Sequence, residues 1–202
     1  MPRPRQSRRA RDFDEIYLSG QPPWDIGRPQ AAFRDLADRG RLVGRVLDVG
    51  CGTGEHTLMA AALGLDATGV DASSAAIGIA QRKAEERQLS ARFVIWDALE
   101  LAGLAESFDT VLDCGLFHVF DDADRPKLVD ALRASMPAGA TYHMLCFSDL
   151  EPGDWGPRRV TQDELRASFQ DGWRVEAIVP SELEVTMDAG SARAWLSTIV
   201  RV

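Results

Sequence analysis

The sequence predicts an α/β fold, in which a mostly parallel, seven-stranded sheet carries helices on both faces and an antiparallel strand at its edge. Seven apolar runs of strand length alternate with segments of helical composition, and such alternation is typical of parallel strands joined by helical crossovers. The first run also ends in a glycine-rich turn that leads into a helix. That strand–turn–helix unit lets a ligand approach bare backbone at a helix N-terminus.

Length and composition indicate a single core. The chain has 202 residues, of which 45% are hydrophobic, and this suffices for one sizeable domain. We expect a basic tail and a short cap helix over residues 1–20, followed by one domain over 21–202. The formal net charge of -8 disfavours a nucleic-acid partner, because an acidic surface repels phosphates.

The positions of the cysteines, histidines and apolar residues argue against a disulfide-bonded, a metal-binding or a membrane-spanning protein. The three cysteines are an odd number without metal-site spacing, which is typical of free thiols in a reducing cytoplasm. The three histidines are too scattered to predict a metal site. No apolar run approaches the ~18 residues of a membrane helix. We therefore expect a cytoplasmic protein without a metal or a membrane partner, and the sequence gives no indication of its oligomeric state.

The elements begin with a cap. Residues 12–18 predict a short helix with Tyr17 on its apolar side. Residues 21–30 are too rich in proline and glycine for regular structure, so Trp24 in this loop is either a lid anchor or part of a binding surface. A helix is expected over 31–39, where a glycine ends it.

The sheet elements follow in order. Strands are expected over 46–49, 66–71, 91–96, 108–113, 140–147, 173–179 and 194–202, of which the last two form an antiparallel pair. Helices are expected over 55–63, 74–88, 126–135 and 161–169. The last of these opens with a capping box formed by Thr161 and Glu164. Residues 148–159 are expected to form a loop around Trp155.

The spacing of the glycines in the turn indicates which class of cofactor it can bind. A dinucleotide fingerprint, Gly-x-Gly-x-x-Gly, would place its third glycine at position 55, which Glu55 occupies. A carboxylate there is expected to repel a pyrophosphate. The turn is no P-loop either, because no Gly-Lys-Ser/Thr follows. Asp71 ends the second strand at the ligand crevice, where a carboxylate can accept hydrogen bonds from both ribose hydroxyls.

The turn, with Asp48 two residues before Gly50, resembles motif I of the class I S-adenosylmethionine-dependent methyltransferases. Val70-Asp71, Trp96-Asp97 and residues 108–113 match further motifs of that family in the same order. The match spans about residues 21–174 and implies a Rossmann-like fold. A narrower likeness to small bacterial thiopurine, thiol and halide methyltransferases rests on three more segments, Pro23-Trp-Asp-Ile-Gly-Arg-Pro-Gln30, Cys114-Gly-Leu-Phe-His118 and Gly156-Pro-Arg-Arg-Val-Thr161.

The resemblance implies contacts with the cofactor S-adenosylmethionine. The residues concerned are Trp24 and Gly27 as a cover, Asp48 near the ammonium, Gly50, Gly52 and Gly54 beneath the methionine part, Asp71 at the ribose, Ala72 beside the adenine, Asp97 and Ala98 at the adenine amino group, and Asp113 and Cys114 near the sulfonium. We expect the methyl acceptor to contact Tyr17, Phe117, His118, Phe147 and Trp155, with His118 as the catalytic residue.

Several of these residues have a simpler structural interpretation. Asp48 can serve only to cap the glycine turn, although a buried aspartate needs a strong reason. His118 can be a hydrogen-bonded structural residue, and Trp155 can be ordinary loop packing. His56 is expected to face solvent at the start of its helix. Cys114 is not expected to act as a nucleophile, because methyl transfer needs no covalent enzyme intermediate.

The expected reaction is direct, in-line transfer of a methyl group from S-adenosylmethionine to a small molecule, which leaves S-adenosylhomocysteine. The acceptor classes considered are thiols, halides, phenols and heteroaromatic nitrogens. Orientation and an apolar, water-poor site favour such a transfer. A thiolate or a halide needs no general base, whereas a phenol needs one, for which His118 is the candidate. Two other classes stay open, a non-catalytic S-adenosylmethionine-binding module and a Rossmann oxidoreductase.

Overall fold

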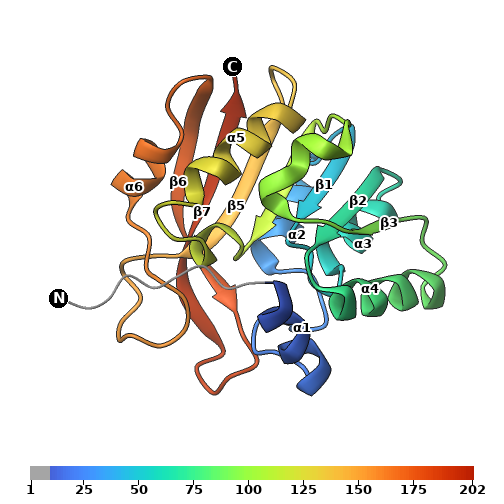
Figure 1. Cartoon of the computed structure of the whole chain (residues 1–202). Helices are drawn as coiled ribbons and strands as arrows, with labels where there is room; N and C mark the ends of the chain where they lie inside the picture. Colours follow the sequence, from blue (N-terminus) through green and yellow to red (C-terminus); the bar gives the residue numbers. More distant parts are fainter. Residues whose placement is uncertain (1–9) are drawn as a thin grey trace.

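A computed structural model describes residues 10–202, and its seven strands form one sheet in the order β3-β2-β1-β4-β5-β7-β6 (Figure 1). The strands are β1 (Arg45–Val49), β2 (Asp66–Asp71), β3 (Arg92–Ile95), β4 (Thr110–Cys114), β5 (Thr141–Phe147), β6 (Trp173–Glu184) and β7 (Ser191–Arg201). Strands β1 to β5 pair in parallel, and β7 pairs antiparallel with both β5 and β6. The predicted α/β fold is confirmed, with β6 as the edge strand.

Helices cover both faces of the sheet. They are α1 (Ala10–Ser19), α2 (Ala31–Asp38), α3 (Glu55–Ala62), α4 (Ser74–Glu86), α5 (Arg125–Ser135) and α6 (Gln162–Ser168), with the short 3-10 helices η1 (Ala98–Leu104) and η2 (Phe117–Val119). Two of the starts follow from capping. The Ser73 side chain accepts from the amide of Ala76, and α6 opens with the predicted capping box, so each satisfies an otherwise unpaired helix donor.

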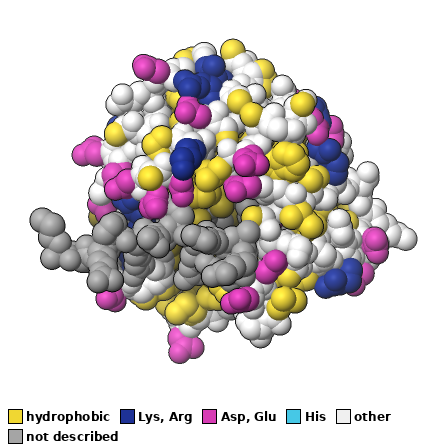
Figure 2. Space-filling model, in the orientation of Figure 1, with side chains coloured by type: hydrophobic (Ala, Val, Ile, Leu, Met, Phe, Trp, Pro, Cys, Tyr) yellow, Lys and Arg dark blue, Asp and Glu magenta, His cyan; other side chains and the backbone are white. Residues whose placement is uncertain are grey.

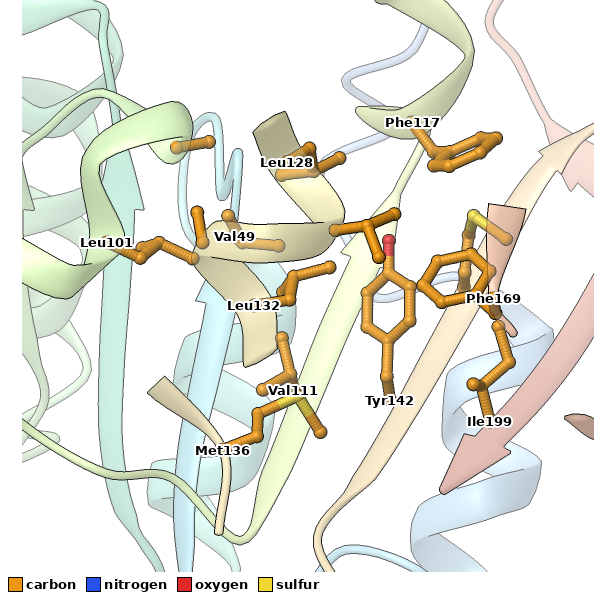
Figure 3. Packing of buried hydrophobic residues seen from close by; sticks show 14 of the residues in the cluster. Val49, Leu101, Val111, Phe117, Leu128, Leu132, Met136, Tyr142, Phe169 and Ile199 are labelled. Atoms are coloured by element: carbon orange, nitrogen blue, oxygen red, sulfur yellow. The ribbon is translucent and has the colours of Figure 1, made fainter. Parts of the chain in front are cut away.

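Alternation along β1 separates the two layers. Leu47 and Val49 belong to a core cluster with η1, α5 and α6, whereas Val46 packs with α2 and α3. The reason is that successive side chains of a strand point to opposite faces. In the first cluster, Val111 and Leu132 meet between β4 and α5 (Figure 3).

The hairpin of β6 and β7 is longer than its apolar runs predict. The run that begins at Trp173 was expected to end before Pro180, but β6 continues to Glu184. An edge strand accepts a proline, because only one side of the strand has to donate to a neighbour. The extension matters for the site. The amide of Thr186 beyond β6 donates to the carbonyl of Pro23 at 2.9 Å, so the hairpin end docks on the N-terminal segment (Figure 1).

The N-terminal cap helix is present as α1, over Ala10–Ser19. The basic tail that precedes it lies outside the described residues. Within residues 10–202, no helix is both long and apolar enough to cross a membrane. On the described part of the face in Figure 2, basic and acidic side chains are interspersed, so that this part presents no continuous basic surface.

Candidate active site

The glycine turn lies at the carboxyl end of β1. At two of its positions, neighbouring side chains leave no room for any residue larger than glycine. Both adopt a positive φ, 53° at Gly52 and 84° at Gly54. A Cβ on Gly52 would lie 2.7 Å from the Tyr17 hydroxyl, and one on Gly54 would lie 2.6 Å from the Phe93 ring. Any larger residue would therefore strain the backbone and collide with a neighbour. Gly52 therefore packs closely against Tyr17 of α1, and Gly54 packs against Phe93 of β3.

Asp48 is buried at the end of β1 and has one oxygen in use. Its Oδ2 accepts from the Thr57 amide at 3.1 Å and from the Thr57 hydroxyl at 2.8 Å. Its Oδ1 is buried and has no partner among the described residues. Burial raises the pKa of Asp48 to about 7. Asp48 thus caps the first turn of α3 and also offers an unused acceptor beside the glycine turn, which suits an ammonium group.

Asp71 joins the glycine turn to the next helix. Its Oδ2 accepts from the amide of Gly52 and its Oδ1 from the amide of Ser73, each at 2.8 Å. Each oxygen keeps a free lone pair, so the predicted contact with two ribose hydroxyls is compatible with this arrangement. Burial raises the pKa of Asp71, while these amides oppose the shift. Ala72, the next residue, is half-buried.

Asp97 and Ala98 lie at the end of β3, on the same edge of the sheet. Asp97 is exposed, and its Oδ1 accepts from the amide of Leu99 at 2.9 Å, which caps η1. Ala98 is buried beneath it. One carboxylate oxygen of Asp97 is engaged by the cap, and the other is available for the predicted adenine contact.

Glu55 does not present an open charge. Its carboxylate pairs with Lys83 on α4 at 2.9 Å and with Arg87, the residue that follows α4, at 2.8 Å. Burial alone would raise the pKa of Glu55, but the hydrogen bonds from Arg87 and Lys83 outweigh it and lower the pKa. The expected repulsion of a pyrophosphate by Glu55 is therefore wrong in its physical basis, since two cations neutralise this carboxylate.

The loop over residues 21–30 lies on the glycine turn. Trp24 donates through Nε1 to the Tyr17 hydroxyl at 3.0 Å. Asp25 accepts from the Thr53 hydroxyl at 3.0 Å and from the Gly27 amide at 3.1 Å. The predicted cover residues Trp24 and Gly27 and the predicted acceptor contact Tyr17 thus lie together on the turn. Beside it, α1, the loop and α4 line a hollow of about 330 Å³.

His56 faces the protein interior, so its predicted solvent exposure is wrong. Its Nε2 accepts from the Gln30 amide at 3.1 Å, and its ring meets Phe33 edge-on. Gln30 in turn exchanges two hydrogen bonds with the backbone of Glu184. Burial lowers the pKa of His56 to about 4. These contacts fasten the N-terminal loop to α3 and to β6.

Three aromatic rings form a wall beyond the end of β4. The His118 ring meets the Phe147 ring edge-on with centroids 5.2 Å apart, and Phe147 meets Trp155 in the same way, also at 5.2 Å. Cys114 is half-buried beside them. Three of the predicted acceptor contacts are thereby brought together, and we call His118, Phe147 and Trp155 the aromatic wall.

Phe117 and Asp113 make contacts in the interior of the protein. Phe117 is fully buried and packs on Phe169 with ring centroids 5.9 Å apart (Figure 3). Asp113 accepts from the amides of Leu116 and Phe117 and from the Tyr142 hydroxyl, the last at 2.6 Å. These contacts occupy both oxygens of Asp113, so they give no support to the predicted roles of Phe117 at the acceptor and Asp113 at the cofactor.

Several residues of the site were missed at the level of sequence. Asp14 on α1 accepts from the Ser73 hydroxyl at 2.6 Å and from the Ala75 amide at 3.0 Å, which ties the cap to α4. Leu183 comes near Gly115 from the hairpin. Neither has a sequence signal, because both contacts join distant segments. Within residues 10–202, no group of histidine, cysteine, aspartate or glutamate residues could hold a metal ion.

Comparison with known proteins agrees with this geometry. Residues 46–139 match the family model described as a methyltransferase domain. The 2-heptyl-1-hydroxyquinolin-4(1H)-one methyltransferase of Mycobacteroides abscessus is 34% identical over 174 residues, which cover 85% of this chain and 77% of the relative. The probable thiol methyltransferase 2 of Arabidopsis thaliana is 27% identical over 182 residues, covering 86% and 78%.

A solved structure extends the likeness to the whole fold. It is described as showing the conversion of a disulfide bond into a thioacetal group during echinomycin biosynthesis, is 36% identical, has a TM-score of 0.87, and covers 96% of this chain and 93% of its own. The magnesium protoporphyrin IX methyltransferase of Synechocystis PCC 6803 shares the fold at 19% identity, with TM-scores of 0.66 and 0.65 for its structures with S-adenosylmethionine and with S-adenosylhomocysteine bound.

The fold defines a Rossmann-like enzyme, with a glycine turn and strand-end carboxylates at the edge of the sheet where such folds bind a nucleoside cofactor. More particularly, the chain belongs to the class I S-adenosylmethionine-dependent methyltransferases. This membership decides against the oxidoreductase alternative.

Proposed function

We propose that this enzyme transfers the methyl group of S-adenosylmethionine to a small acceptor held against the aromatic wall, namely a thiol, a halide, a phenol or a heteroaromatic nitrogen. One observation carries the proposal: the segment that leads from β4 to His118 contacts the glycine turn through Leu116. A Cβ on Gly50 would lie 3.0 Å from Cβ of Leu116, in the segment between β4 and His118. A cofactor on the turn and an acceptor on the wall would therefore be neighbours.

The residues around the glycine turn fit the cofactor. Asp48 offers its unpaired Oδ1 to an ammonium group, on the strand that leads into the glycine turn, where we place the methionine part. Asp71 has lone pairs for the ribose, and Asp97 has one free oxygen for the adenine amino group. The cofactor supplies a methyl group already activated on a sulfonium. The chain has to orient the acceptor and exclude water, which is chiefly an entropic contribution.

The cover over the site favours a small acceptor. Tyr17 and Trp24 lie over the glycine turn, and the end of the β6–β7 hairpin is bonded to the loop that carries Trp24. A folded protein or a nucleic acid would have to displace these contacts to reach the wall. The relatives from Mycobacteroides abscessus and Arabidopsis thaliana are described as acting on a hydroxyquinolone and on thiols, and these are small molecules.

The test is release of S-adenosylhomocysteine from S-adenosylmethionine over a panel of thiols, halides, phenols, hydroxyheteroarenes and nitrogen heteroaromatics. Wild type is expected to turn over at least one class. Asp71→Ala is expected to lose cofactor affinity by about 1.5–3 kcal/mol, the value of hydrogen bonds to a charged group. Glu85→Ala, on the exposed side of α4, is the matched control and is expected to behave as wild type.

The competing proposal is a non-catalytic module that binds the cofactor. Cofactor binding that Asp71→Ala weakens, together with no turnover over the whole panel, would favour that module and refute the proposed acceptors. Turnover by Asp71→Ala at the wild-type rate and affinity would refute the placement of the cofactor.

A further inference from the structure

His118 has a defined proton position. Its Nδ1 accepts a hydrogen bond from the backbone amide of Phe147 at 3.0 Å. A neutral imidazole carries one N–H, and the nitrogen that accepts a hydrogen bond is the one without it. The proton of His118 is therefore on Nε2. The bond to Phe147 also fixes the plane of the ring, since a backbone amide on β5 cannot rotate away.

Arg159 places a fixed positive charge beside this ring. Its guanidinium donates to carbonyls of the loop that carries Trp155, namely those of Glu151, Pro152, Gly153, Trp155 and Pro157. It also lies over the Phe147 ring, 5.3 Å from its centroid, and over the Trp155 ring at 5.7 Å. These carbonyls are neutral, so they hold the guanidinium in place without cancelling its charge.

The surroundings keep His118 uncharged. Burial, followed by the positive charge of Arg159, lowers the pKa of His118 to about 3. On β4, which leads to His118, the titratable residues are Asp113, whose oxygens are bound by Leu116, Phe117 and Tyr142, and Cys114, whose thiol pKa is raised by burial. Neither supplies a negative charge in contact with the imidazole that would favour a second proton.

The Nε2 atom of His118 faces Gly115. A Cβ on Gly115 would lie 3.2 Å from Nε2, and the next neighbour there is Leu183. Within residues 10–202, the amide of Phe147 is the one hydrogen-bond partner of His118. A side chain at position 115 would thus crowd this donor, and glycine leaves it uncrowded on that side.

We propose that His118 is an N–H donor that binds the methyl acceptor as an anion, and that the substrates are small molecules with an acidic thiol or an acidic hydroxyl on a heteroaromatic ring. This assignment rests on the proposed function and narrows it. A donor at fixed geometry makes a charge-assisted hydrogen bond to such an anion, and the charge of Arg159 favours the same ionised form. His118 then orients the acceptor and is not a general base.

The transfer step balances without a proton. The acceptor reaches the site already ionised, having lost its proton to solvent. Its lone pair forms the new bond to the methyl carbon, while the carbon–sulfur bond to that methyl breaks and the electron pair of the broken bond stays on sulfur. The products are the neutral methylated acceptor and S-adenosylhomocysteine.

The first arm of the test is the protonation of His118, measured by ¹⁵N NMR of the whole chain. The chain has three histidines, so His118→Gln identifies the His118 signals by their loss, and His143→Gln serves as the matched control on β5. We expect the Nε2–H tautomer and no protonation of His118 between pH 8 and pH 5. An Nδ1–H tautomer, or titration of His118 within that range, would overturn the proposal.

The second arm is kinetic and compares His118→Gln with His118→Phe. Glutamine supplies an N–H donor near the Nε2 position but no base, and phenylalanine supplies neither. We expect His118→Gln to keep kcat/KM within about tenfold and His118→Phe to lose about 10²–10³-fold, the usual effect of removing one positioned donor. An equal loss in both variants would overturn the donor role, because a base would be missing from both.

The pH profile of kcat/KM distinguishes a failure of the donor role of His118 from a failure of the proposed function. Over a series of aryl thiols and hydroxyheteroarenes of graded acidity, the acid limb of kcat/KM is expected to follow the pKa of each acceptor, in wild type and in His118→Gln alike. An acid limb at one pH for every acceptor, which His118→Gln removes, would identify a base and overturn the proposal. Wild type that turns over no acceptor at all would instead refute the proposed function, whatever the tautomer.

Discussion

Cofactor binding is expected to release a proton from Asp48. In the free protein, burial raises the pKa of this carboxyl to about 7, and Oδ1 has no partner. A cofactor ammonium placed at Oδ1 favours the carboxylate, since an opposite charge within a few ångströms lowers the pKa of an acid. The ammonium itself has an ordinary pKa of about 7.7–8.0, so it stays charged from pH 6 to pH 7.

The magnitude follows from that pKa. If only the ionised form of Asp48 binds the cofactor, the apparent Kd of the cofactor is proportional to one plus the ratio of protonated to ionised Asp48. For a pKa of about 7 this gives an apparent Kd about fivefold higher at pH 6 than at pH 7, or about 1 kcal/mol. Binding at pH 6 is expected to release about 0.9 protons, and binding at pH 7 about 0.5.

Isothermal titration calorimetry in buffers of different ionisation enthalpy measures both quantities. Asp48→Asn is expected to bind more weakly and to release no proton, because an amide keeps the shape and cannot ionise. Asp71→Asn is the matched control: it also loses affinity, but Asp48 is still present to release the proton. No proton release by wild type at pH 6, or the same release by Asp48→Asn, would refute the reasoning.

Three further predictions concern stability, each measured by urea unfolding. Gly54→Ala is expected to lower the free energy of unfolding by about 2–5 kcal/mol, because of its positive φ and overpacking against Phe93. Gly40→Ala also has a positive φ but open space around it, so it should lose only about 1–2 kcal/mol. Equal losses in the two variants would show that the collision with Phe93 does not occur. His56→Gln should remove about 2 kcal/mol of the wild-type loss in stability between pH 8 and pH 5. The sign follows because the pKa is about 4 in the folded state against about 6.5 unfolded, so protons favour the unfolded chain as the pH falls below 6.5; an unchanged pH dependence would contradict this. Tyr142→Phe should lose about 1.5–3 kcal/mol through its bond to the Asp113 carboxylate, and a loss below about 0.5 kcal/mol would show that Asp113 is satisfied without it.

Local signals in the sequence predicted that the residues expected at the cofactor share one edge of the sheet, and the structure places them together there. Asp48 and the three glycines after it are contiguous, and Asp71 and Asp97 each end a strand. In a parallel sheet, such strand ends meet at one edge, so periodicity and spacing alone bring these residues together. The capping box at Thr161 is likewise local, and the structure confirms it.

Contacts between distant segments were out of reach. The run from Trp173 was expected to end before Pro180, but pairing with β7 carries β6 on to Glu184. Helical position did not reveal that His56 turns inward to the Gln30 amide. Glu55 was taken for an open charge, because its partners Lys83 and Arg87 come from another helix and the residue that follows it.

The sequence by itself determined the fold class and the cofactor, because each depends on the alternation of elements and on short motifs. Only the tertiary structure decided the state of the individual groups. The proton of His118 is placed by an amide 29 residues away, and the carbonyls that hold Arg159 form a loop that only folding closes. Protonation and charge in a buried site depend on neighbours in space, and a linear pattern does not contain them.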